Sequence, residues 1–115
     1  MLVVLAITVG VLFTCGLYLM MRRSLLKLVL GLILLSHAAN LAVFVSAGLT
    51  RSPAPLTDVG ASSPQAGAAD PLPQALVLTA IVIGFAVVSF AAVLVRRMCE
   101  SMAGDDPDLM RSTDT

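Results

Sequence analysis

Three long apolar runs dominate the chain and restrict what it can fold into. They cover residues 1–21, 25–49 and 72–95. A membrane-spanning helix needs about 20 apolar residues, because the hydrocarbon core is about 30 Å thick and a helix rises about 1.5 Å per residue. Backbone groups in lipid must also be paired within the segment itself, which a helix achieves. We therefore predict an all-α membrane protein with three transmembrane helices.

Composition and length agree with a membrane protein of one domain. Hydrophobic residues make up 58% of the 115 residues, charged residues make up 12%, and the mean hydropathy is +0.99. A soluble domain is roughly a quarter charged. We expect one membrane domain over residues 1–97, a loop over 50–71 and a polar tail over 98–115. The first run has no basic residue before Arg22, as a signal peptide would have, so we expect it to be retained.

Basic residues predict the orientation of the spans, because lysine and arginine accumulate in cytoplasmic segments. Most of the basic residues lie in the turn between the first two runs and at the end of the third run. The long loop has one basic residue, near its start. The cytoplasmic set is Arg22, Arg23, Lys27, Arg96 and Arg97, and the loop residue is Arg51. We expect the C-terminus to be cytoplasmic, and the N-terminus and the loop to be external.

The sequence Asp70-Pro71-Leu72-Pro73-Gln74 leads into the third run. Proline is tolerated in the first turn of a helix, where its missing N–H would be unpaired anyway. Aspartate is a favoured residue for capping the exposed N–H groups of that turn. We therefore predict that Asp70 caps the third helix, and that Pro71 and Pro73 fix the direction in which the chain approaches it.

The sequence holds no pattern for catalysis, cofactor binding or metal binding. Cys15 and Cys99 fall at different predicted depths, which argues against a disulfide between them. A single histidine and two distant cysteines do not have metal-ligand spacing. A phosphate-binding loop, a dinucleotide fingerprint and a nucleophile motif are absent. We expect no enzyme activity, no cofactor, no metal and no nucleic-acid partner.

The second run contains a polar group, Ser36, His37 and Asn40, whose spacing places all three on one side of a helix. Polar groups at membrane depth usually face other protein or water. Two roles stay open. The favoured one is packing, in which these side chains form hydrogen bonds to another helix. The other is a proton relay through His37, since imidazole titrates near neutral pH.

The third run contains the polar residues Gln74 and Thr79 in its first part. They would line a contact with a neighbouring subunit, although the Thr79 hydroxyl can also bond the carbonyl of Ala75 within the helix. Small residues that permit close helix packing are more numerous than three helices can use among themselves. They include Gly10, Gly16, Gly31, Ala38, Ala80, Gly84 and Ala91. This surplus predicts a subunit of a larger assembly.

The run from Asp70 to Ile83 resembles the signature of the C subunit of the Mrp-type multisubunit sodium/proton antiporters, which is related to the K subunit of complex I. Residues 31–41 resemble the second helix of that family and residues 51–55 resemble its loop, so the resemblance covers about residues 2–97. It implies a multi-pass subunit in a bacterial plasma membrane, needed for assembly and coupling. Its partners would be membrane lipid and the other subunits, which would handle the cation and the proton.

The resemblance also separates the chain from its closest alternative. The complex I subunit has a glutamate of the proton path in its second and third helices, and these positions fall at Ile33 and Gly84. Antiporter C subunits commonly have serine at the second position. A K-like subunit of complex I or of a membrane-bound hydrogenase stays an alternative. A stand-alone small multidrug exporter is less favoured, because it needs an intramembrane glutamate and usually a fourth span.

Overall fold

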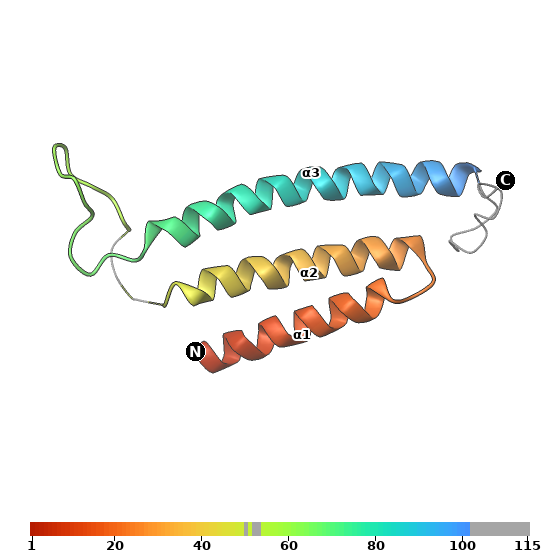
Figure 1. Ribbon diagram of the computed structural model, residues 1–115, viewed down its shortest axis with the longest axis horizontal. Helices are drawn as coiled ribbons and strands as arrows, with labels where there is room; N and C mark the ends of the chain where they lie inside the picture. Colours follow the sequence, from red (N-terminus) through yellow and green to blue (C-terminus); the bar gives the residue numbers. More distant parts are fainter. Residues whose placement is uncertain (50, 52–53, 102–115) are drawn as a thin grey trace.

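The computed structural model describes residues 1–49, 51 and 54–101. These residues form three helices in the order α1 (Leu2–Met20), α2 (Leu25–Ser46) and α3 (Pro71–Ser101), as Figure 1 shows. All three are long and apolar enough to cross a membrane. The prediction of an all-helical protein with three spans is therefore confirmed.

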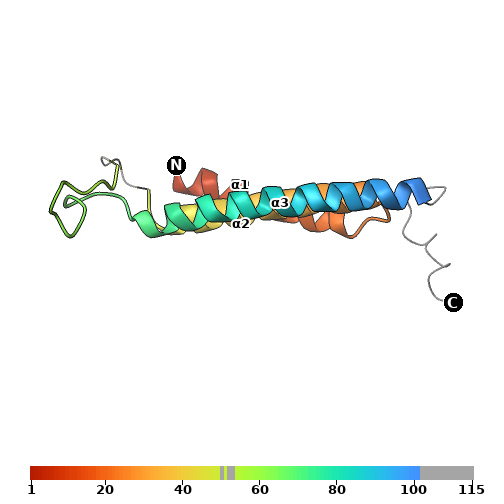
Figure 2. The same ribbon diagram turned by 90° about the horizontal axis from the view of Figure 1, so that it is seen from above.

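The helices lie side by side with α2 between α1 and α3 (Figure 1). Figure 2, turned by 90°, shows them overlapping along one line, so they form a single layer. Successive helices run in opposite directions. The N-terminus and the α2–α3 loop lie at one end of the layer, and the α1–α2 turn and the C-terminal end of α3 lie at the other.

The ends of α2 are set by local backbone chemistry. The Ser24 hydroxyl accepts a hydrogen bond from the Lys27 N–H at 3.4 Å and caps the first turn. The helix ends at Ser46, three residues before the end of the predicted span, and Gly48 follows with a φ of +85°. Glycine adopts this left-handed conformation without the penalty of a Cβ atom, so it favours a helix end here.

The start of α3 matches the prediction made from its proline pair. Pro71 is the first helical residue, and the carboxylate of Asp70 accepts a hydrogen bond from the Leu72 N–H at 3.0 Å. The capping role of Asp70 is thus confirmed. The helix continues past the apolar run to Ser101, so residues 98–101, which we assigned to a polar tail, are helical. The remainder of that tail, 102–115, and Thr50, Ser52 and Pro53 of the loop lie outside the described residues.

The helices α1 and α2 pack through glycine. A Cβ atom on Gly31 would lie 2.7 Å from the carbonyl oxygen of Gly16, and one on Gly16 would lie 3.0 Å from that of Gly31. Both glycines and Ala38 are buried, which confirms that small residues bring these helices close. Gly10 was expected to take part as well. It does not pack against α2, because a Cβ atom there would meet nothing within 4 Å.

Packing between α2 and α3 is looser. No residue of α3 is buried, whereas α2 has four buried residues. The side of α3 that faces α2 is only half-buried, and it consists of small, branched and flexible residues at helical spacing. These residues are Pro73, Val77, Ala80, Gly84, Val88, Ala91, Val95 and Met98.

Candidate polar pocket between the second and third helices

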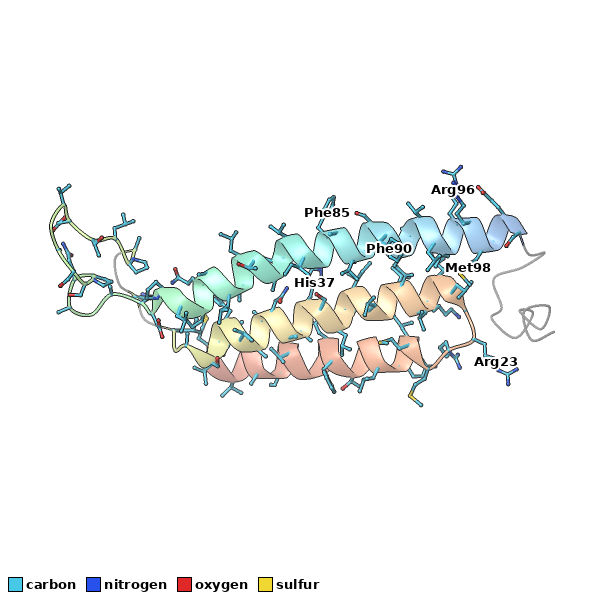
Figure 3. The ribbon with its side chains drawn as sticks, turned by 45° about the horizontal axis from the view of Figure 1, so that its top comes forward. Arg23, His37, Phe85, Phe90, Arg96 and Met98 are labelled. Carbon is cyan, nitrogen blue, oxygen red and sulfur yellow. The ribbon has the colours of Figure 1, made fainter. Side chains whose placement is uncertain are left out.

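A pocket of about 240 Å³ lies between α2 and α3. Its α2 side contains the three polar residues predicted from the sequence, Ser36, His37 and Asn40. Figure 3 shows His37 on the side of α2 that faces α3. The expectation that these residues share one side of the helix is therefore met. The other lining residues are apolar, namely Ile33, Ile81, Gly84, Phe85 and Val88.

Gly84 leaves part of the α3 wall of this pocket without a side chain. A Cβ atom at this position would meet only the Ser36 hydroxyl, at 3.4 Å, which is an ordinary contact distance. This glycine is therefore unlike Gly16 and Gly31, where the neighbouring backbone leaves no room for a Cβ atom. Gly84 opens space beside a polar group and does not draw the two helices into backbone contact.

The polar side of the pocket faces an apolar wall. Within the described residues, no hydrogen bond joins Ser36, His37 or Asn40 to α3. Ser36 and Asn40 are half-buried, while His37 is exposed. Their hydrogen-bonding groups are thus available to water or to a group from outside this chain. The packing role predicted for them does not operate between α2 and α3.

The two positions that the resemblance to the complex I subunit aligns with glutamates both line this pocket. Ile33 contributes from α2 and Gly84 from α3. By that alignment, the pocket has an isoleucine and a glycine in place of two acidic residues. Three apolar lining residues, Ile81, Phe85 and Val88, were not predicted. Ile81, Phe85 and Val88 follow one another at intervals of four and three residues, and this helical spacing beside Gly84 is the signal that could have identified them.

Gln74 and Thr79 lie outside the pocket. The Thr79 hydroxyl is exposed and donates to the Ala75 carbonyl at 3.1 Å, which is the local bond considered as the alternative to a contact with another subunit. Gln74 lines a smaller pocket of about 100 Å³ where the end of α2 meets the start of α3, together with Asp70 and Pro73. The structure thus places Ser36, His37 and Asn40 in the middle of the layer and Gln74 at its loop end, while Thr79 lines neither pocket.

Neither place resembles a metal centre. Among the described residues, no three histidine, cysteine or acidic side chains lie close enough together to hold a metal ion. Cys15 and Cys99 are both free thiols. What the arrangement offers is hydrogen bonding by a serine, a histidine and an amide inside an otherwise apolar layer.

The chain is thus a small helical membrane protein, with three antiparallel helices in one layer and polar residues on the middle helix. Residues 4–114 match the family described as NADH-ubiquinone/plastoquinone oxidoreductase chain 4L. The chain belongs to this family.

Within the family, the chain is similar to two bacterial antiporter subunits. It is 48% identical over 111 residues to the C subunit of the Na⁺/H⁺ antiporter of Alkalihalophilus pseudofirmus, an alignment that covers 96% of each chain. It is 40% identical over 112 residues to the corresponding C subunit of the Na⁺/H⁺ antiporter of Bacillus subtilis, covering 97% of this chain and 96% of that one. These relatives confirm the resemblance drawn from the Asp70–Ile83 signature.

Two solved structures share the fold. A chain of the Mrp complex from Dietzia is 44% identical with a TM-score of 0.69, and the match covers 90% of this chain and 74% of that chain. A chain of a membrane-bound sulfane sulfur reductase, an archaeal respiratory membrane complex, is 30% identical with a TM-score of 0.78, covering 93% and 96%. Both relatives come from multisubunit membrane complexes.

Proposed function

We propose that this chain is a small membrane subunit of a multisubunit sodium/proton antiporter in a bacterial plasma membrane. The observation that supports this most strongly is the 48% identity to an antiporter C subunit along almost the whole of both chains. The chain of the Mrp complex adds a structural relative of the same kind. Its partners are the other antiporter subunits and the surrounding lipid.

The helices favour a role in assembly and coupling over direct ion exchange by this chain. Within the apolar parts of the three helices, residues 2–20, 25–46 and 71–95, there is no aspartate or glutamate. Binding a cation or a proton inside a membrane normally requires such a carboxylate. The single layer also leaves the outer sides of α1 and α3 uncovered by the other described helices (Figure 1). We infer that larger subunits perform the exchange and that this chain acts in assembly and coupling beside them.

A subunit of a respiratory complex is the second candidate. It is favoured by the higher TM-score to the sulfane sulfur reductase chain, 0.78 against 0.69. Sequence identity points the other way, because it is 30% to that chain and 44% to the chain of the Mrp complex. The absence of acidic residues at positions 33 and 84 also favours the antiporter branch. We retain the antiporter as the proposed function.

We further propose that the polar residues meet neighbouring subunits at two places. Gln74 and Thr79 are exposed on α3, where a polar side chain of another subunit would bond the Gln74 amide and the lone pairs that the Thr79 hydroxyl keeps beside its bond to Ala75. Ser36, His37 and Asn40 face a pocket with room for such a side chain or for water. Hydrogen bonding to a partner is the favoured role for this group, and a proton relay through His37 is the alternative.

Orientation is part of the proposal. The basic residues lie at the end of the layer that holds the α1–α2 turn and the end of α3, and this excess of positive charge supports a cytoplasmic location for that end. The N-terminus and the α2–α3 loop would then face outward. The known tendency of positive segments to stay inside supports this assignment.

The experiment that tests the proposed function compares three sets of everted membrane vesicles from a host lacking its own antiporters. One set holds the complete complex, one lacks this chain, and one holds this chain alone. We expect sodium-driven proton movement only with the complete complex. Exchange by the chain alone would exclude a subunit role. Co-purification with redox subunits, instead of antiporter subunits, would favour the respiratory alternative.

A further inference from the structure

The two ends of the layer differ strongly in charge. One end contains the α1–α2 turn and the last turns of α3 (Figure 1). Its charged residues are Arg22, Arg23, Lys27, Arg96, Arg97 and the single described acid Glu100. At the opposite end, the charged side chains that the structure describes are one arginine and two aspartates, Arg51, Asp58 and Asp70. The basic end therefore has an excess of positive charge that the rest of the described chain does not balance.

A cleft of about 280 Å³ lies on α3 within this basic end. Val93, Arg96, Arg97 and Glu100 line it. The Nε of Arg96 donates to the Oε1 of Glu100 at 2.9 Å, while the two side chains stay 81% and 58% exposed. A guanidinium has five N–H donors, so this bond leaves its terminal NH₂ groups available. Figure 3 shows Arg96 pointing away from α2, toward the side of α3 that the other described helices leave uncovered.

The surface below the cleft is apolar. Val93 and Phe90 lie one and two turns toward the middle of the membrane from Arg97, and their side chains are 59% and 71% exposed. Arginine next to exposed apolar surface within two helical turns matches the two chemical parts of a phospholipid. Guanidinium groups recognise phosphate through short, charge-assisted and often bidentate hydrogen bonds.

We propose that this cleft binds an anionic phospholipid. The headgroup phosphate bonds the guanidinium groups of Arg96 and Arg97, and an acyl chain lies along Val93 and Phe90. Glu100 is part of the site and opposes binding, because its carboxylate repels the phosphate and competes for Arg96. The inference is independent of whether the chain serves an antiporter or another complex.

Native mass spectrometry of the purified full-length chain tests the proposal. The chain is titrated in detergent with phosphatidylglycerol, and separately with phosphatidylcholine of the same acyl chains. We expect the anionic lipid to be retained preferentially, and added salt to weaken it. A basic residue near an anionic lipid surface contributes ~1 kcal/mol, which corresponds to about a fivefold change in affinity. The double variant R96Q/R97Q should therefore lose roughly 25-fold in affinity for phosphatidylglycerol.

Two single variants sharpen the test. Arg51→Gln removes a positive charge at the opposite end and should leave lipid retention unchanged. Glu100→Gln removes the opposing carboxylate and should raise the affinity about fivefold, by the same charge arithmetic. Circular dichroism of every variant checks that the helices are intact, and only variants with the helix content of the parent are compared.

Three results would overturn the proposal. The first is equal retention of the anionic and the zwitterionic lipid. The second is a change in affinity that does not depend on the cleft residues. This would be a loss in Arg51→Gln as large as the loss in R96Q/R97Q, or no gain in affinity in Glu100→Gln. The third is displacement of the lipid by millimolar inorganic phosphate, which would show a site for free anions in place of a lipid site.

Discussion

Gly31 is the residue on which the contact between α1 and α2 depends most directly. A Cβ atom there would lie 2.7 Å from the Gly16 carbonyl oxygen and 2.9 Å from the backbone nitrogen of Met20. Backbone atoms cannot move aside as a flexible side chain can, so the helices themselves would have to separate. We expect Gly31→Val to lower the free energy of unfolding in detergent by about 3 kcal/mol, the upper end of the usual cost of overpacking.

Gly10→Val is the matched control for that change. It places the same side chain in an α1 position where a Cβ atom meets nothing within 4 Å, so its effect on unfolding should be small. Thermal unfolding of the purified chain, followed by circular dichroism, measures both variants. Equal effects would contradict the view that close packing is concentrated at the Gly16–Gly31 contact.

His37 allows the packing role and the relay role to be separated. His37→Gln keeps hydrogen-bonding capacity but removes the titratable imidazole, whereas His37→Leu removes both. If His37 packs against a partner, the glutamine variant should keep the exchange rate and pH profile of the parent complex, and the leucine variant should weaken assembly. Loss of one such bond costs about 0.6–2 kcal/mol, so the defect should be partial. Exchange lost equally in both variants would support the relay.

At the scale of elements, α3 is the helix to which we assign the coupling contact. We expect Gln74→Ala and Thr79→Ala each to reduce the rate of ion exchange by the intact complex. The reduction should be partial, because one lost interhelical hydrogen bond costs about 0.6–2 kcal/mol. Pro73→Ala should cost more, because the proline helps to fix how the chain enters the first turn of the helix.

Thr14→Ala is the matched control on α1. The Thr14 hydroxyl bonds the Gly10 carbonyl at 2.7 Å, and the Thr79 hydroxyl bonds the Ala75 carbonyl at 3.1 Å, so both threonines make the same kind of local bond. A larger defect at Thr79 would then report a contact beyond its own helix. If the α3 variants all exchange ions like the parent, the signature is only a helix start and α3 has no coupling role.

At the scale of the whole molecule, the charge asymmetry predicts the orientation in the membrane. A reporter fused after Arg97 should be cytoplasmic, and one inserted near Ser62 in the α2–α3 loop should be external. Alkaline phosphatase and green fluorescent protein fusions measure the two sides independently. The opposite pattern at both sites would reverse the orientation of all three spans, although it would leave the helices themselves unchanged.

The sequence by itself determined the number, class and approximate limits of the helices. Apolar length and the need to pair every backbone group inside lipid leave little alternative to a helix. The cap at Asp70 was also predictable, because the aspartate and the Leu72 N–H are neighbours in sequence. The extension of α3 to Ser101 was not, because the end of the apolar run marks the membrane boundary and helix hydrogen bonds can continue in water.

Only the tertiary structure decided which surfaces meet. Lipid tails are as apolar as leucine, so hydrophobic pattern does not distinguish a helix face that packs against protein from one that faces lipid. For that reason Gly10 and Gly16 looked equivalent in sequence, while only Gly16 meets α2. The same ambiguity concealed that Gly84 lines a pocket together with Ser36 and His37. Distances across the layer, which the order of residues does not contain, settled both points.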